Sequence, residues 1–289
     1  MSVLMFSLIP IFIDAIAVLG LYVIAASGRL SVGHAAFFGI GGYASGLLSI
    51  HLGAPLPVAL VAGAAIAGLA GTVLGMIIDR LGHWFYATTT LAFSVMLSGL
   101  ISSMEFFGSA TGLHGVPLTV DFPLVAGCLA ATIAIVALLD RSALGRRIKA
   151  VRESELAAES IGINLFRTRV AAMCIGTALA GLAGGLWAHY LGLIKPADIG
   201  LERSLLFLIF LAIGSLESWY GALLGTLLLG YLPEVLRFSR EYRLAFFGSL
   251  LAIAMVLRPY GLLTVQMKLW PFGRGPQRGA GTPPGKPPA

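Results

Sequence analysis

The stretch D-R-S-A-L-G-R-R-I-K-A-V-R-E-S-E-L-A-A-E-S-I-G-I-N-L-F-R-T-R, from Asp140 to Arg169, decides the fold of this 289-residue chain. It holds seven of the 19 Lys/Arg and four of the 13 Asp/Glu, whereas the sequence on both sides is strongly apolar. A charged segment between apolar segments is typical of a loop in water, and an excess of Lys and Arg places such a loop in the cytoplasm. The sequence therefore predicts a membrane protein with a cytoplasmic loop at residues 140–169.

Within this loop we expect a helix of about two turns at residues 155–161. Ser154 is a good N-cap, and Gly162 is a residue that often ends a helix in the left-handed conformation. Glu155 suits the first turn of a helix. It lies four residues before Glu159, and two like charges at this spacing are mildly unfavourable, which favours solvent or a basic partner.

One face of this short helix consists of small and apolar residues. Ala157, Ala158 and Ile161 share a stripe, because residues three and four apart are neighbours on a helix. A short helix with small residues on one side can lie in a groove of another protein. The alternative is an ordinary cytoplasmic loop with a surface helix, and these residues alone leave both open.

The composition predicts an all-α fold, a polytopic transmembrane helical bundle. The chain is 58% hydrophobic and 11% charged, against roughly 25% charged residues in soluble domains. Its 37 glycines fit close helix packing in a membrane. The net charge of +6 comes from loops and a tail rather than one face of a domain, so nucleic-acid binding is not expected. Cys128 and Cys174 lie in apolar spans and are expected to be packing residues.

We expect about eight or nine hydrophobic segments, some broken or re-entrant. They are 4–26, 27–47, 57–78, 84–103, 122–139, 170–190, 204–213, 220–236 and 245–257. With the loop inside and nine segments, 14 of the 19 Lys/Arg lie inside and the N-terminus lies outside. The exception is the cluster 237–243, which moves inside if 204–225 is re-entrant. A transmembrane domain at 1–265 then precedes a disordered, basic, cytoplasmic tail at 266–289.

Polar residues inside the apolar segments are the candidates for function. Asp14 is either a functional intramembrane acid or an acid that helix tilt brings to a headgroup. Ser31 is a possible helix cap, and His34 either lines a pathway in a broken helix or is packed against backbone. No second ligand lies near His34, so no metal site is expected. The candidates for a pathway are Ser31, His34, Phe37, Phe38, Thr89, Thr90 and Phe93.

Four stretches resemble one known family. L-A-A-E-S-I-G at 156–162 is similar to the core of the coupling loop of bacterial ABC import permeases, although Leu156 stands where the general motif has Glu. G-R-L-S-V-G-H-A-A-F-F-G-I-G-G-Y at 28–43 matches a signature of the permeases for branched-chain amino acids. F-Y-A-T-T-T-L-A-F at 85–93 and R-P-Y-G-L at 258–262 resemble further motifs of that family. The resemblance covers nearly the whole chain except its tail.

The resemblance implies a membrane permease subunit of an ATP-driven ABC importer in the bacterial plasma (inner) membrane. Its partners would be a second permease subunit, two cytoplasmic ATPase subunits and a periplasmic or extracellular solute-binding protein, besides membrane lipid. ATP would be bound by those partners, because the chain has no G-x-x-x-x-G-K-[ST] loop, and no cofactor of its own is expected. The residues implied in ATPase coupling are Arg152, Glu153, Glu155, Ala157, Ala158, Glu159 and Gly162.

The implied activity is import of branched-chain or other small amino acids by alternating access. The same type of transporter with urea or short amides as cargo is the alternative. An intramembrane enzyme is a remote alternative, because the five histidines are scattered and no G-x-S-x-G or H-E-x-x-H motif occurs. An ion channel is equally remote, because no repeated filter or ring of acids is present. No catalytic residue is therefore expected.

Overall fold

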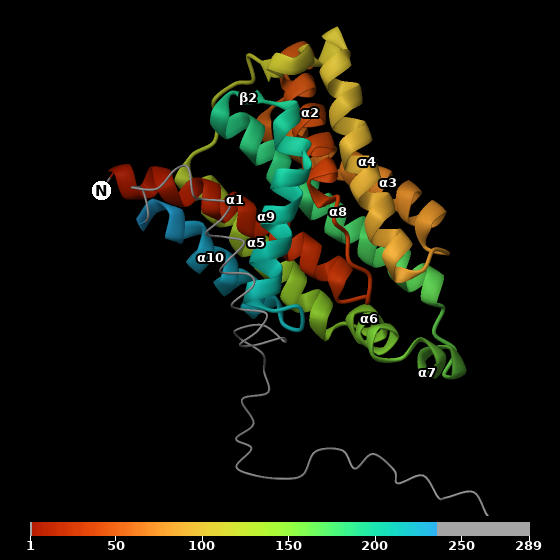
Figure 1. The fold of residues 1–289 in the computed structure, drawn as a ribbon. Coiled ribbons are helices and arrows are strands. Elements are labelled where there is room, and N and C mark those ends of the chain that lie inside the picture. Colours follow the sequence, from red (N-terminus) through yellow and green to blue (C-terminus); the bar gives the residue numbers. More distant parts are fainter. Residues whose placement is uncertain (1, 236–289) are drawn as a thin grey trace, which may run out of the picture.

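The structure is a computed structural model of the chain that describes residues 2–235 (Figure 1). This part of the chain is almost entirely helical, which confirms the predicted all-α bundle. The α-helices are α1 (Ser2–Ala25), α2 (His34–Leu52), α3 (Leu56–Ile78), α4 (His83–Ser103), α5 (Phe122–Arg141), α6 (Ala143–Glu153), α7 (Glu155–Ser160), α8 (Leu165–Leu191), α9 (Leu201–Gly214) and α10 (Trp219–Val235).

Six of these helices, α1 to α5 and α8, are long and apolar enough to cross a membrane. The pair α9 and α10 passes the same test together, but its two halves are bent by 118° at a short break, so up to seven spans are present in the described residues. The break lies in the region 204–225, for which the sequence analysis considered a re-entrant conformation as an alternative. The expected segment 245–257, the basic cluster 237–243 and the tail 266–289 lie outside the described residues.

Helix α8 is the centre of the bundle and packs against α1, α2 and α3 (Figure 1). A Cβ built on Gly41 of α2 would lie 2.2 Å from the Cα of Gly181 of α8, and a Cβ on Gly181 would lie 2.4 Å from the Cβ of Ala67 of α3, so neither glycine can carry a side chain. One turn later, Gly185 faces Leu60 and Ser45. Gly181 and Gly185 are four residues apart, a spacing typical of helix-packing faces in membrane proteins.

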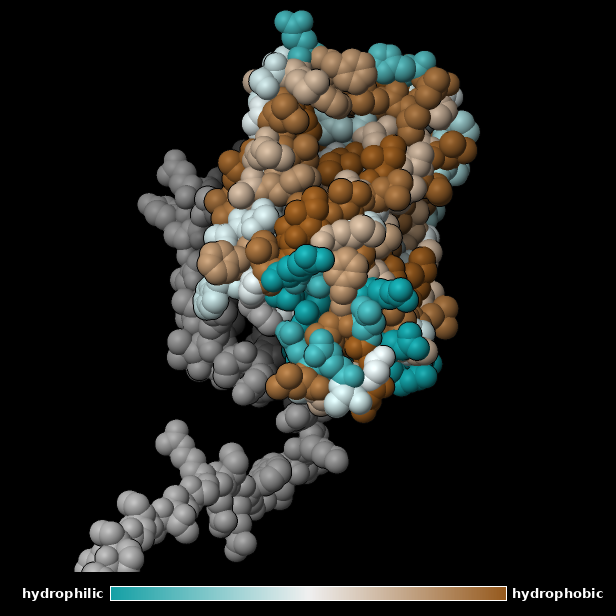
Figure 2. All heavy atoms as spheres, turned by 90° about the vertical axis from the view of Figure 1, so that its right-hand side faces the viewer, coloured by the Kyte–Doolittle hydropathy of each residue, from teal (hydrophilic) through white to brown (hydrophobic). Residues whose placement is uncertain are grey.

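The outer surface of the bundle has the character of a lipid-facing protein. On the face in Figure 2, apolar side chains cover the upper part, and polar ones gather at the lower end. Helix α3 contributes Val61, Leu69 and Ile77, which are 66–68% exposed. Large apolar side chains exposed along a long helix are expected where the solvent is hydrocarbon.

At the end of the bundle opposite α6 and α7, two loops that are far apart in sequence form a small cap (Figure 1). The cap consists of the 3₁₀ helices η1 (Glu105–Phe107), η2 (Ser109–Thr111) and η3 (Pro196–Ile199) and the strands β1 (Leu113–His114) and β2 (Leu193–Ile194). The strands pair antiparallel, with Leu113 opposite Ile194. With the charged loop inside, the alternation of the predicted segments places both loops outside, and their pairing at one end of the bundle fits that expectation.

Candidate coupling and pathway sites

The charged loop folds into two short helices, α6 and α7, where the sequence analysis expected one. Ser142 caps α6, and its hydroxyl oxygen accepts a hydrogen bond from the backbone N–H of Gly145. A serine followed by apolar residues three apart could have predicted α6 from the sequence. The many basic residues of α6 made this pattern hard to recognise. Ser154 caps α7 as expected, and its hydroxyl accepts from the N–H of Ala157. Gly162 follows α7 with φ +82°, which confirms its expected left-handed conformation.

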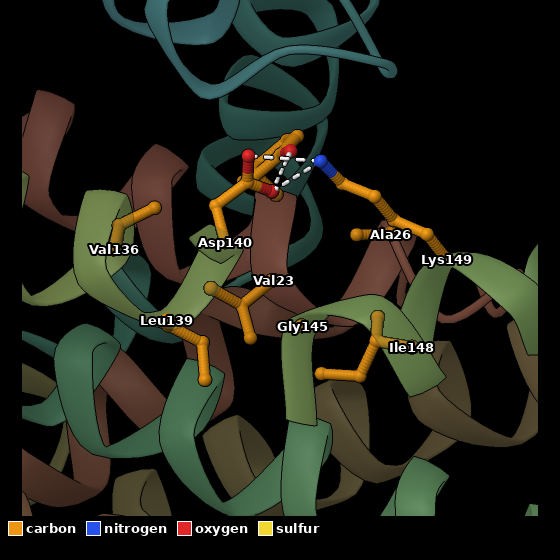
Figure 3. A pocket seen from close by; sticks show the side chains of 9 residues that line it. Val23, Ala26, Val136, Leu139, Asp140, Gly145, Ile148 and Lys149 are labelled. Atoms are coloured by element: carbon orange, nitrogen blue, oxygen red, sulfur yellow. Dashed lines mark hydrogen bonds and ion pairs between the residues drawn. The ribbon is translucent and has the colours of Figure 1, made fainter. Parts of the chain in front are cut away.

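Helix α6 packs against the end of the bundle (Figure 3). Its Ile148 is buried in a small pocket between α1 and α5, while the Lys149 ammonium lies 2.7 Å from the Asp140 carboxylate. The Tyr22 hydroxyl of α1 donates to the same carboxylate over 3.4 Å. One apolar contact and one polar contact thus hold α6 against two membrane helices.

Helix α7 presents a different face to solvent from the one expected. Ala158 is 1% exposed and packs against the chain itself, whereas Ala157 is exposed. Leu156 is 83% and Ile161 73% exposed, so the apolar surface of α7 is formed by these two larger side chains. The predicted common face of Ala157, Ala158 and Ile161 is therefore wrong, because in this short helix the side towards the bundle takes the small Ala158.

The other coupling candidates divide between solvent and contacts within the chain. Glu153 and Glu159 are exposed. Arg152 donates to the main-chain oxygen of Leu216, in the turn between α9 and α10. The Glu155 carboxylate lies 2.5 Å from the Arg169 guanidinium of α8. The spacing of Glu155 and Glu159 favoured solvent or a basic partner, and Arg169 is a basic partner of Glu155 in the same chain. The role of these residues in coupling stays a prediction.

A cluster of four charges lies beneath α7 and was missed by sequence reasoning. It consists of Arg29, Asp79, Glu155 and Arg169, which interact electrostatically with one another. Burial raises the pKa of Asp79, and the attraction of Arg169 and then Arg29 opposes the shift. Burial and the repulsion of Arg169 lower the pKa of Arg29. In the sequence these residues counted only as loop charges, since nothing local shows that 29, 79 and 169 meet.

Arg29 fixes the position at which the chain re-enters the bundle after α1. Its guanidinium donates to the main-chain oxygens of Leu81 over 2.7 Å and of Asp79 over 3.0 Å. It also lies 5.5 Å from the ring centre of Tyr86. From Arg29 to Gly33 the chain is not helical, and α2 begins only at His34.

This extended segment, residues 29–33, is the broken helix that the sequence analysis considered. Two backbone N–H groups, one in this segment and one in the first turn of α2, bond to side chains, as polar backbone groups at a break inside a membrane protein require. The N–H of Val32 donates to Thr90 Oγ1 over 3.1 Å, and the N–H of Ala35 donates to Ser204 Oγ over 3.1 Å. Ser31 was expected to cap α2. Instead the N-cap is Gly33, without a side-chain cap bond, and Ser31 is buried with no hydrogen-bond partner among the described residues.

Most of the expected pathway residues are packed inside the subunit. Ser31, His34, Phe37, Phe38 and Thr90 are at most 1% exposed. Nε2 of His34 lies 3.0 Å from the main-chain oxygen of Ala17, which is the backbone-bonded alternative. The rings of Phe37 and Phe93 are stacked at 5.6 Å. Only Thr89 and Phe93 of the seven candidates are partly exposed, and the other five are buried within the subunit, so a role in a pathway stays a prediction.

A second intramembrane contact was not expected at all. The Asp14 carboxylate of α1 accepts a hydrogen bond from the Arg203 guanidinium of α9 over 2.6 Å. The same guanidinium lies 4.0 Å from the ring centre of Trp187 and 5.0 Å from that of Phe38. For Asp14, the sequence analysis had left a functional role and a position near a headgroup open. Tertiary contact between α1 and α9 gives the acid a partner and the cation an aromatic surface.

Comparison with known proteins identifies the family. The family model described as "Branched-chain amino acid transport system / permease component" matches residues 3–255. The chain belongs to this permease family. The members of the family are transport components and not enzymes. Within residues 2–235, no three His, Cys, Asp or Glu side chains are grouped so as to hold a metal ion.

Three relatives show how far the similarity extends. The permease is 28% identical over 285 residues to the high-affinity branched-chain amino acid transport system permease protein LivM of Escherichia coli, covering 86% of this chain and 67% of LivM. LivH of Salmonella typhimurium is 30% identical over 165 residues, 56% of this chain and 51% of LivH. BraD of Pseudomonas aeruginosa is 32% identical over 129 residues, 43% of this chain and 41% of BraD. No solved structure matches the permease significantly.

Proposed function

We propose that this permease is the membrane subunit of an ATP-driven importer that carries branched-chain amino acids across the bacterial inner membrane. The observation that carries the proposal is the end of the bundle formed by α6 and α7. This end is charged, is fastened to α1, α5, α8 and the turn between α9 and α10, and exposes Leu156 and Ile161 on a short helix. An apolar pair on a helix fixed to several spans is suited to receive a force from a cytoplasmic partner.

The partner is a pair of cytoplasmic ATPase subunits that bind ATP themselves. Docked on α7, they change its position when ATP binds and is hydrolysed. Because α6 and α7 contact four parts of the bundle, such a movement reaches the spans and alternately opens the pathway to each side. An external solute-binding protein delivers the amino acid. A second permease subunit completes the pathway, which agrees with the burial of five pathway candidates within this subunit, and the sequence similarity to both LivM and LivH supports such a pair.

Reconstitution tests the proposal. The permease is assembled in liposomes with the second permease, ATPase and binding-protein subunits from the same genome, and uptake of labelled leucine and of labelled urea is measured with and without ATP. ATP-dependent uptake of leucine is expected. Uptake of urea without uptake of leucine would show that the cargo is urea. Uptake that does not depend on ATP would contradict the proposal of an ATP-driven importer.

A pair of matched variants tests the docking surface. Leu156→Asp places a charge in the apolar surface of α7, so retention of the ATPase in a pull-down should fall at least about tenfold if the contact is worth about 1.4 kcal/mol or more. Leu118→Asp is the control, because Leu118 is 72% exposed and lies in the outer loop. Equal retention by both variants would show that α7 is not the docking site.

A further inference from the structure

Arg169 lies between two carboxylates that belong to different parts of the permease. Its guanidinium lies 2.5 Å from the Glu155 carboxylate of α7. Arg169 also lines a groove of about 650 Å³ at the cytoplasmic end, together with Asp79, which follows α3. Arg169 is 7% and Asp79 8% exposed, so both charges are largely removed from water. One buried cation therefore has two acids within its electrostatic reach and forms an ion pair with one of them.

The second acid, Asp79, is poorly satisfied in this conformation. Its Oδ1 atom is buried and has no hydrogen-bond partner among the described residues. Arg29 bonds the main-chain oxygen of Asp79 rather than its carboxylate. Burial raises the pKa of Asp79 in spite of two neighbouring arginines, which means that its charged form is destabilised in this environment. A buried carboxylate oxygen without a donor costs free energy, which a hydrogen bond from Arg169 recovers.

The two acids belong to different structural elements around Arg169. Glu155 belongs to α7, the helix that exposes Leu156 to a cytoplasmic partner. Asp79 ends α3, and its main-chain oxygen holds Arg29, the first residue of the extended segment 29–33. An ion pair of Arg169 with Glu155 thus links α8 to α7. An ion pair with Asp79 would instead link α8 to the end of α3 and, through Arg29, to the extended segment.

We propose that Arg169 exchanges its ion pair from Glu155 to Asp79 when α7 moves, and thereby passes the position of α7 to α3 and to the extended segment 29–33. The structure represents the state in which the pair with Glu155 is formed. Displacement of α7 releases the guanidinium, which then pairs with the Asp79 carboxylate in the adjoining groove. Only the cause of the displacement, a docked ATPase, rests on the proposed function. The exchange itself is a property of this chain.

The thermal stability of the full-length permease in lipid nanodiscs at neutral pH tests the exchange without any partner. In the wild-type background, Asp79→Asn removes an unpaired buried charge, so the melting temperature should rise by about 2–4 °C. In the Glu155→Gln background Arg169 has lost its first partner and pairs with Asp79, so the same Asp79→Asn change should lower the melting temperature. Asp121→Asn in the exposed outer loop is the matched control and should have the same small effect in both backgrounds. An Asp79→Asn effect of one sign in both backgrounds overturns the exchange.

The amount of leucine transported per ATP provides a second test. This ratio would not change if Asp79 had only a structural role. In the reconstituted importer, Asp79→Asn should retain the ATPase and hydrolyse ATP, yet carry several-fold less leucine per ATP, although the subunit itself is more stable. A leucine-to-ATP ratio equal to that of wild type and Asp121→Asn overturns the role in coupling. If the wild-type complex transports nothing with ATP, the proposed function fails, while the reversal of sign in nanodiscs still decides the exchange.

Discussion

Arg152 donates a hydrogen bond from Nη1 to the main-chain oxygen of Leu216, 2.8 Å away. This bond joins α6 of the charged loop to the turn between α9 and α10, 64 residues further along the chain. It places that turn on the same side as α6 and α7. Arg152 is partly exposed, and its second interaction, with Glu217 at 4.0 Å, is long.

Loss of this bond should loosen the contact between α6 and the turn. Arg152→Ala leaves a main-chain oxygen without its charged donor, and we expect a loss of about 1–2 kcal/mol in the free energy of unfolding. Thermal unfolding in nanodiscs measures it. The control is Arg147→Ala, an exposed arginine on the same helix, which should have little effect. Equal melting temperatures for both variants would show that the bond contributes nothing.

The arrangement of the two ends of the bundle predicts the orientation in the membrane. A cysteine at Ser109 in the outer cap should react with an impermeant thiol reagent added to whole cells with a permeable outer envelope. A cysteine at Ser160, at the end of α7, should react only after the inner membrane is opened. Both are measured in a background in which Cys128 and Cys174 are replaced by alanine. Labelling of position 160 but not of position 109 in intact cells would show that the protein has the opposite orientation.

Thr90 should prove to be a structural residue of the extended segment. Thr90→Val removes the acceptor of the Val32 N–H, and an unsatisfied buried N–H costs about 1–3 kcal/mol. Thr90→Ser keeps the hydroxyl and should retain most of the stability. Thr89→Val makes the same change on the partly exposed neighbour and should be nearly neutral for stability. If Thr90→Val instead unfolds at the wild-type temperature but transports differently, Thr90 is a pathway residue, as the sequence first indicated.

Two substitutions at α7 should act in different ways. A Cβ at Gly162 meets no atom within 4 Å, so Gly162→Val is penalised only for the left-handed backbone, by about 1–2 kcal/mol. It should displace the end of α7 and weaken retention of the ATPase, whereas Gly162→Asn should be milder.

Ala158→Trp should instead destabilise the permease itself. The site is buried within the chain, and overpacking costs typically about 1–3 kcal/mol. The exposed neighbour provides the control, since Ala157→Trp should leave the melting temperature unchanged. Both measurements use the purified subunit. A tolerated tryptophan at 158 would contradict the packing of α7 described above.

The pair of Asp14 and Arg203 should depend on the shape of the cation as well as its charge. Arg203→Lys keeps a positive charge near Asp14 but loses the planar group next to Trp187, and we expect a loss of about 0.5–2 kcal/mol in stability. Arg203→Gln removes the charge and should cost more. The measurement is thermal unfolding of both variants against wild type. A lysine variant as unstable as the glutamine variant would indicate that the charge contributes little and the guanidinium shape everything.

Sequence alone determined the features that depend on local chemistry. Apolar segments long enough to cross hydrocarbon indicate where the long spans lie, and the excess of Lys and Arg in the charged loop predicts that this loop is cytoplasmic. The limits of α7 also followed from single residues, because Ser154 satisfies free N–H groups at its start and Gly162 adopts the left-handed turn at its end. Helix α6 escaped notice because its basic residues masked the two apolar positions that it buries.

Tertiary structure decided which side chains meet, and no local pattern contains that information. Asp14 and Arg203 are 189 residues apart and pair only because α1 and α9 pack together. Thr90 holds the N–H of Val32 only because α4 crosses the extended segment. Ala158 faces inward since the bundle lies on that side of α7, although its helical position alone permitted either face. The physical reason is common to all three: spacing along one helix fixes which residues share a face, and only packing against other helices fixes what that face touches.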